Sequence, residues 1–268
     1  MQYKLIWELI KKDWAEAYKS RQVLLMTTVA PFLLGVGLPA FILIIMGSVP
    51  LDSLDNDLKI FLQLLPAVTP DWNFLSERAK GLILFSIFGQ LFLLLIPVMI
   101  GSYVSADTII GEKERQTIEG LFLLPLTDLE ILIAKVGVSF IPIIGLTWLM
   151  SLLYAGIVDL VLITHLDRIL LPDIRFILLV LFFTPLLGLA SITVTVLVSS
   201  RVSTVRDAQQ ITGILLIPAM LLVIGQMIII LINTWLIIIG TIILLVFDLL
   251  TLKISLTFFN REKLVTST

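Results

Sequence analysis

The chain has 268 residues, of which 59% are hydrophobic and 14% are charged, and its mean hydropathy is +1.10. These values lie far outside the range of soluble globular domains and indicate a protein that crosses a membrane several times. The net charge of −2 provides no basic field, so no nucleic-acid partner is expected. The lack of cysteine and the single histidine argue against disulfides, thiolate metal sites and a cysteine nucleophile. We therefore predict no catalytic residue and no metal site.

Residues 1–22 predict an amphipathic helix ahead of the first apolar run. At helical spacing one face carries Leu5, Ile6, Leu9, Ile10, Trp14, Ala17 and Tyr18. Lysines and glutamates occupy the remaining positions, which is typical of a helix that lies in the membrane interface with an aromatic anchor. A short helix that packs on protein is the alternative.

Six apolar stretches are long enough to cross the hydrocarbon core, which takes about 20 residues. They are 23–49, 81–106, 136–163, 174–198, 211–232 and 234–256. Helices are the expected form, because lipid offers no partner to an open backbone and the runs lack the polar alternation of barrel strands. The predicted fold is all-α, with a six-helix transmembrane domain over 23–258 and a short tail over 259–268.

The distribution of basic residues predicts the orientation of the chain. Thirteen of the eighteen lysines and arginines fall on the side that holds both termini and the loops 107–135 and 199–210. Because cytoplasmic loops carry the excess of Lys and Arg, we expect this side to be cytoplasmic, in a multi-pass protein of the cell membrane. A longer, acidic segment, 50–80, is then the largest piece on the opposite side.

The loop 107–135 combines charged and apolar residues between the second and third spans. Charges of both signs come from Glu112, Lys113, Glu114, Arg115 and Glu119. An apolar run, 121–124, follows, and Pro125 is expected to stop the helix. An ordinary cytoplasmic loop would show basic excess alone, whereas this mixed surface is suited to docking on a soluble partner.

Three segments of the chain resemble the permeases of type-2 ABC exporters. The coupling-helix signature of that family is matched by Glu112, Glu114, Arg115, Thr117, Glu119, Leu121, Pro125, Glu130 and Lys135. The second loop, SSRVSTVRDAQQ over 199–210, is similar to the family's Ser-x-Arg…Ala-Gln segment, and FNREK from Phe259 is similar to its usual ending. Gln116 departs from the pattern, since the family often has Gly there.

This resemblance implies the membrane subunit of an exporter. Its partners would be a cytoplasmic ABC ATPase, which holds ATP and Mg, a second permease copy and the lipid bilayer. The second copy would be identical or merely similar to the first. The chain itself has no G-x-x-x-x-G-K-[ST] loop, so it is expected to bind no cofactor and to be no enzyme. The residues expected to couple to the ATPase are Glu112, Lys113, Glu114, Arg115, Thr117, Glu119, Leu121, Phe122, Pro125, Arg201 and Arg206. The alternative is a non-transporting sensor or scaffold that recruits a cytoplasmic protein through the same loop.

Polar and proline residues inside the spans are candidates for a pathway and for hinges. The pathway candidates are Gln90, Thr147, Ser151, Gln226 and Asp248, although such side chains often only join helices. A structural anchor is the alternative for Asp248, because an intramembrane charge is costly and points to a function only by default. The prolines are Pro31, Pro39, Pro97, Pro142, Pro185 and Pro218, each of which removes a backbone hydrogen bond and permits a kink. The sequence does not identify the transported substrate.

Overall fold

The computed structural model describes residues 3–48, 72–115, 125–199, 202, 204–211, 214 and 234–258. These residues are almost entirely helical. The main α-helices are α1 (Tyr3–Ala17), α4 (Leu38–Ser48), α6 (Glu77–Leu93), α7 (Leu95–Glu114), α9 (Asp128–Leu166), α11 (Thr184–Ser199) and α13 (Thr234–Phe258). Shorter helical pieces are α2 (Arg21–Leu24), α3 (Ala30–Phe32) and α10 (Ile174–Leu178). A 3₁₀ turn spans Trp72–Phe74. The described part of the chain contains no strand, in agreement with the predicted helical fold.

Five helical stretches of the described chain are long and apolar enough to cross a membrane. They are Leu25–Ser48, Glu77–Glu112, Leu129–Leu166, Ile174–Ser199 and Thr234–Ser255. Each corresponds to one of the six predicted spans. The remaining prediction, 211–232, falls outside the described residues except at positions 211 and 214, as does the predicted tail over 259–268.

Two of the helical stretches extend well beyond the apolar runs that predicted them. The third predicted span, 136–163, lies within the 39-residue helix α9, which is about 58 Å long at 1.5 Å per residue. A hydrocarbon core of about 30 Å accounts for only half of this length. A span predicted from hydropathy ends at the first charged residue, whereas the hydrogen-bonded helix continues through charged residues. Most of the predicted loop 107–135 that the structure describes is therefore helix, as the last turns of α7 and the first turns of α9.

Prolines coincide with most of the irregular turns. Wider π-helical turns cover Leu25–Val29, Leu33–Gly37 and Leu179–Phe183, and each one ends two residues before a proline, namely Pro31, Pro39 and Pro185. The break between α6 and α7 at Leu94 similarly precedes Pro97. A proline lacks the N–H group and its ring displaces the carbonyl four residues earlier, so the preceding turn widens or breaks. Pro142 lies in the interior of α9 without such a turn.

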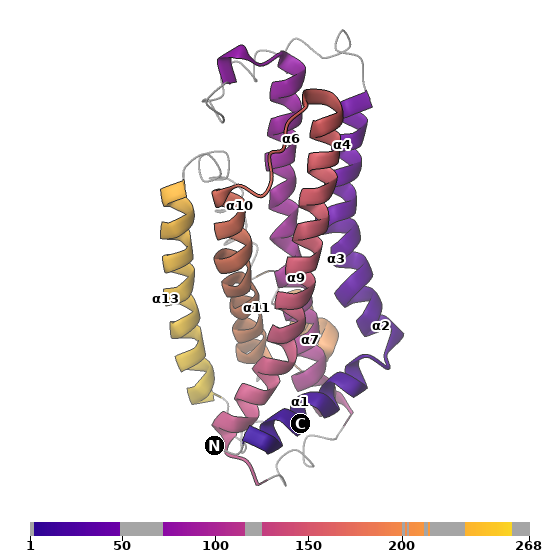
Figure 1. The fold of residues 1–268 in the computed structure, drawn as a ribbon. Helices are drawn as coiled ribbons and strands as arrows, with labels where there is room; N and C mark the ends of the chain where they lie inside the picture. The colour runs from indigo at the N-terminus through magenta and orange to yellow at the C-terminus, as the bar shows by residue number, and fades with distance from the viewer. Residues whose placement is uncertain are drawn as a thin grey trace.

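The long helices stand side by side, and α7 packs along both α9 and α11 (Figure 1). At Gly101 of α7 an added Cβ would overlap the Oγ atom of Ser191 on α11, so the two backbones approach closely there. Helix α13 lies at the edge of the bundle and packs on α11. Buried aliphatic side chains from α6, α7, α9 and α11 form one continuous core.

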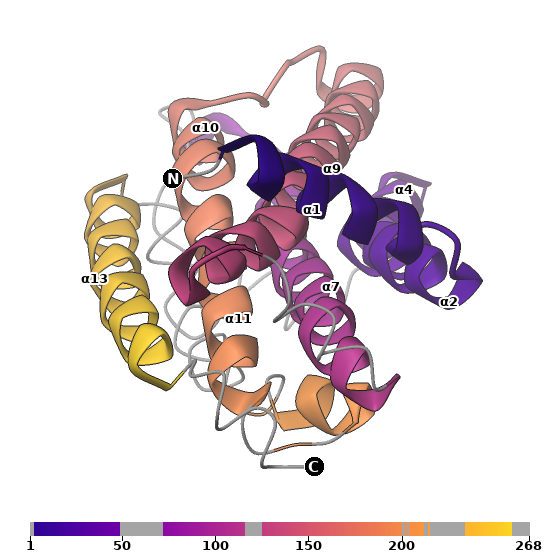
Figure 2. The same ribbon diagram turned by 90° about the horizontal axis from the view of Figure 1, so that it is seen from below.

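Helix α1 lies across one end of the bundle, over α9 and α7 (Figure 2). It forms over the predicted residues, and its buried face consists of Ile6, Leu9, Ile10, Asp13 and Ala17. Two residues assigned to the apolar face, Leu5 and Tyr18, are exposed instead. The buried face of α1 thus carries one acidic side chain, that of Asp13, among apolar residues. We call this end of the molecule the α1 end.

Candidate coupling site

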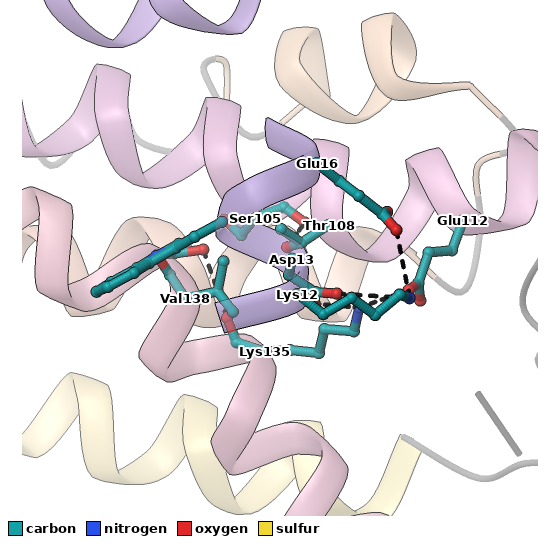
Figure 3. A network of polar contacts seen from close by, with 10 residues as sticks. Lys12, Asp13, Glu16, Ser105, Thr108, Glu112, Lys135 and Val138 are labelled. Carbon is teal, nitrogen blue, oxygen red and sulfur yellow. Dashed lines mark hydrogen bonds and ion pairs between the residues drawn. The ribbon is translucent and has the colours of Figure 1, made fainter. Parts of the chain in front are cut away.

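A buried group of ionic side chains joins three helices at the α1 end (Figure 3). The Nζ atom of Lys135 on α9 lies 2.7 Å from Oδ2 of Asp13 on α1 and 2.9 Å from Oε1 of Glu112 near the end of α7. The exposed fractions of these side chains are 1% for Lys135, 3% for Asp13 and 8% for Glu112. One buried ammonium group thus holds two carboxylates that are brought together only by the fold. We call these three residues the ion cluster.

Lys12 lies at the solvent edge of the ion cluster. Its Nζ atom is 3.9 Å from a carboxylate oxygen of Asp13, 3.9 Å from one of Glu112 and 3.7 Å from one of Glu16. With 56% of its side chain exposed, Lys12 keeps most of its hydration. The second positive charge reduces the excess of negative charge that the two carboxylates leave beside Lys135.

Further contacts hold α1 on α9 within one turn of the ion cluster. The indole N–H of Trp14 donates to the backbone carbonyl of Val138 at 2.8 Å. Between these contacts, an added Cβ at Gly137 would meet Cδ1 of Ile10 at 3.1 Å. This distance is shorter than an ordinary van der Waals contact, so a side chain at position 137 would require Ile10 to shift, and the two helices are in close contact at this point.

Helix α9 begins with a capping box that sets the position of Lys135. The Thr127 hydroxyl accepts from the backbone N–H of Glu130 at 3.3 Å, and Oε2 of Glu130 accepts from the backbone N–H of Thr127 at 3.0 Å. These bonds satisfy two of the donors that a helix start leaves open. Lys135 follows two turns later, on the face that also carries the buried Ile131 and Val138.

The two predicted cytoplasmic loops meet at the end of α7. The backbone N–H of Val205 donates to Oε2 of Glu114 at 3.2 Å, across 91 residues of sequence. Arg115, whose side chain is 52% exposed, donates to Oδ1 of Asp107, about two turns earlier on α7, at 2.9 Å. Arg206, next to Val205, is exposed. Glu114, Arg115 and Arg206 therefore belong to one region of the α1 end.

The structure separates the predicted coupling residues into distinct groups. Glu112 is buried in the ion cluster, whereas Glu114, Arg115, Pro125 and Arg206 are exposed or at the surface. The structure describes the backbone of Lys113 but not its side chain. Outside the described residues lie Thr117, Glu119, Leu121, Phe122 and Arg201.

Three of the pathway candidates lie on α6 and α9, near a contact between these helices. The Tyr154 hydroxyl of α9 donates to the carbonyl of Ser86 on α6 at 2.7 Å. Gln90 lies one turn after Ser86 on α6, and Ser151 lies one turn before Tyr154 on α9. Because the two helices are antiparallel, both residues lie on the same side of the contact between Tyr154 and Ser86. Thr147 follows one further turn along α9. All three candidates are buried, and among the described residues the hydroxyls of Thr147 and Ser151 have no hydrogen-bond partner.

Asp248 lies apart from these candidates, buried on α13 against α11. Nearby on the same face of α13, Thr251 hydrogen-bonds to Thr193 of α11 at 3.0 Å, and Ser255 donates to the carbonyl of Thr193. Neither carboxylate oxygen of Asp248 has a hydrogen-bond partner among the described residues. Gln226 falls outside them.

Sequence reasoning missed three acids that organise the structure. Asp13 gives a usable signal, because it stands alone among apolar residues on one face of α1. Asp159, which lies inside the third predicted span, accepts from the backbone N–H groups of Leu170 and Leu171 at 2.9 and 3.0 Å. It fixes the turn after α9. Asp107 gives no such signal, because its partner Arg115 becomes apparent only from the helix.

The family comparison matches residues 72–247, more than half of the chain, to the model described as "ABC-2 family transporter protein". The chain belongs to the ABC-2 transporter family. It is therefore a multi-pass membrane protein of a family of transporter permeases, whose members generally work with an ABC ATPase subunit. The matched range contains the end of α7, all of α9 and the pathway candidates other than Asp248, but not α1. No curated protein and no solved structure matches the chain.

Proposed function

We propose that this chain is the membrane-spanning permease subunit of an ABC exporter. In this proposal it has six spans with both termini in the cytoplasm, and it pairs with a second copy, in the simplest case an identical one. A separate cytoplasmic ATPase subunit holds ATP and Mg, and its hydrolysis drives export of a substrate across the cell membrane. Family membership supports this class of function.

The contact of Glu114 with Val205 carries the coupling part of the proposal. It joins the two loops that face the cytoplasm in the predicted orientation, at the ends of α7 and α11. A partner that docks there contacts both loops at once and moves both helices. The docking residues are then Lys113, Glu114, Arg115, Thr117, Glu119, Leu121, Phe122, Pro125, Arg201 and Arg206. Glu112 contributes from inside the protein, through Lys135.

Co-purification tests the proposal. Tagged protein is extracted from its native membrane in mild detergent, the associated proteins are identified by mass spectrometry, and ATPase activity is measured. We expect an ATPase with a phosphate-binding loop to be recovered. Replacing Arg115 and Glu119 by alanine should reduce its recovery or its permease-dependent ATPase activity without loss of membrane insertion. Arg168→Ala, at an exposed position two residues beyond the opposite end of α9, is the control.

Two results would contradict the proposal. Recovery of no ATPase, under conditions that preserve other membrane complexes, would favour the sensor or scaffold. Equal ATPase recovery and activity in the Arg115 and Glu119 variant and in the unchanged chain would remove these two residues from the docking surface.

A further inference from the structure

The ion cluster is placed where the proposed docking region joins the rest of the protein. Glu112 is three residues before Arg115, and Lys135 is ten residues after Pro125. The segment between Arg115 and Pro125 therefore has one buried charge of the cluster on each side. The third member, Asp13, belongs to a helix that the chain reaches more than ninety residues earlier. A displacement of either flank acts directly on α1.

Stability alone does not account for this arrangement. Removing two carboxylates and one ammonium group from water is costly, and well-packed apolar residues are often at least as stabilising as a buried ion pair. The best-attested use of such groups is to fix one register between elements. Here the ionic contacts fix the position of α1 relative to α7 and α9.

Helix α1 connects directly to the first span. Only residues 18–20 separate the end of α1 from the start of α2, and helical turns follow without interruption to Ser48. The Trp14 bond to Val138 and the close approach of Ile10 to Gly137 make α1 and the start of α9 one packed unit. A shift of α9 at this point is thus carried to Arg21 and the span that follows.

We propose that the ion cluster of Asp13, Glu112 and Lys135 transmits displacement of the docking region through α1 to the first span. Lys135 is the positioning residue, because it holds both carboxylates and therefore all three helices. Asp13 is the residue through which a movement of Lys135 displaces α1. This inference rests on the proposed function, since the displacement comes from a bound ATPase.

The natural lack of cysteine makes a direct test possible. Single cysteines are introduced at Leu129, on the first turn of α9, and at Arg21, at the start of α2, both of which are exposed. Each variant is reconstituted in lipid with its ATPase subunit, and the rate of labelling by a soluble maleimide is measured without nucleotide and after trapping with ATP and vanadate. In the otherwise unchanged chain we expect both rates to respond to trapping, by about two- to thirtyfold.

Lys135→Met is expected to reduce the response at Arg21 strongly, because only the Trp14 bond and the Ile10 contact then join α1 to α9, and to preserve the response at Leu129. Lys4→Met, which changes an exposed lysine of α1, is the matched control and should preserve both. If Lys135→Met does not fold, the combination Asp13→Asn, Glu112→Gln and Lys135→Met removes the ionic contacts without leaving a charge unbalanced, and the same selective loss is expected. Lys135→Arg, which keeps the charge, should retain a response at Arg21.

A disulfide provides the rescue experiment. Cysteines replace Ile10, whose Cγ1 atom lies 3.8 Å from the Cβ position of residue 137, and Gly137, so that a disulfide between them connects α1 to α9 covalently. Formed before labelling in the Lys135→Met background, this disulfide is expected to restore the response at Arg21. A disulfide that restores thermal stability but not this response would show that the ion cluster has only a structural role, and would overturn the inference.

The remaining outcomes separate the inference from the function on which it rests. A response at Arg21 that is undiminished in both the Lys135→Met and the charge-free variant overturns the inference and leaves the exporter proposal intact. A complex in which neither cysteine responds in the unchanged chain contradicts the coupling proposal itself, and the inference with it.

Discussion

Lys135 and Asp13 are 122 residues apart in the sequence, and their charged atoms lie 2.7 Å apart in the interior of the protein. The contact attaches the N-terminal helix to the membrane bundle at the point where α9 begins. Because Glu112 shares the same ammonium group, the contact also connects the end of α7. One side chain therefore joins α1, α7 and α9, and it contributes both to the stability of the α1 end and to its proposed mechanical role.

Replacing Lys135 by methionine should destabilise the protein strongly. Removal of one partner leaves Asp13 and Glu112 buried beside each other without their ammonium group, and breaking a buried pair in this way costs about 3–5 kcal/mol. Thermal unfolding of the purified protein in detergent measures the effect. Lys11→Met breaks the exposed pair with Glu8 at 3.3 Å and should cost less than about 1 kcal/mol. Equal unfolding temperatures for the two variants would refute this prediction.

Adding a methyl group at Gly89 should disturb the interface of α6 and α9. An added Cβ there would overlap the hydroxyl of Tyr154, which is completely buried and bonded to the carbonyl of Ser86. We expect Gly89→Ala to cost about 1–3 kcal/mol in unfolding experiments, as overpacking typically does. Gly156→Ala, on α9, meets nothing within 4 Å and should be neutral or stabilise the helix by up to about 1 kcal/mol.

Removal of the hydroxyl should partly relieve that overlap. Tyr154→Phe alone loses one hydrogen bond, at a cost of about 0.5–1.5 kcal/mol. Combined with Gly89→Ala, it should cost less than the sum of the two single changes, and a double-mutant cycle measures the difference. Strict additivity would show that the two positions do not interact.

The capping box at the start of α9 should contribute measurable local stability. Thr127→Ala removes the acceptor for the Glu130 backbone N–H and is expected to cost about 0.5–2 kcal/mol. Hydrogen exchange should show faster exchange in the first turn of α9 and unchanged exchange near Tyr154. Thr164→Ala, which removes a hydroxyl from the last turns of the same helix, should leave exchange in the first turn unchanged.

The contact between Glu114 and Val205 predicts a difference between two substitutions. Glu114→Gln keeps a carbonyl oxygen that can accept from the Val205 N–H, whereas Glu114→Ala does not. If the contact aligns the two docking loops, the permease-dependent ATPase activity of the reconstituted complex should fall more in the alanine variant. Equal activities in both variants would mean that the alignment does not depend on this bond.

The predicted spans correspond well to the structure because they depend on local properties. Apolar runs of sufficient length form helices in lipid whatever their neighbours are. Five of the six are present as helices within the described residues. The helix ends were less predictable, since charged residues mark the end of an apolar run and not the end of backbone hydrogen bonding. Helix α9 shows this, because Asp128 and Lys135 lie in the helix that continues into the third span.

The candidate site was predictable in composition and not in geometry. The sequence indicated that Glu112 and Lys135 belong to a segment with a distinctive function, and the chain's membership of the ABC-2 transporter family is consistent with it. The amino-acid sequence did not indicate that Glu112 and Lys135 are buried against each other. The sign of a charge is local, but its burial depends on which helices pack around it.

By itself, the sequence determined that this protein is helical, that it crosses a membrane several times and that it belongs with ABC-2 permeases, because hydropathy, helical spacing and motif residues are properties of short segments. Only the tertiary structure decided that Asp13 lies on Lys135 and that Val205 lies on Glu114. Both contacts join segments far apart in the chain, and a pair of this kind forms only where packing of the apolar faces has already brought the helices together.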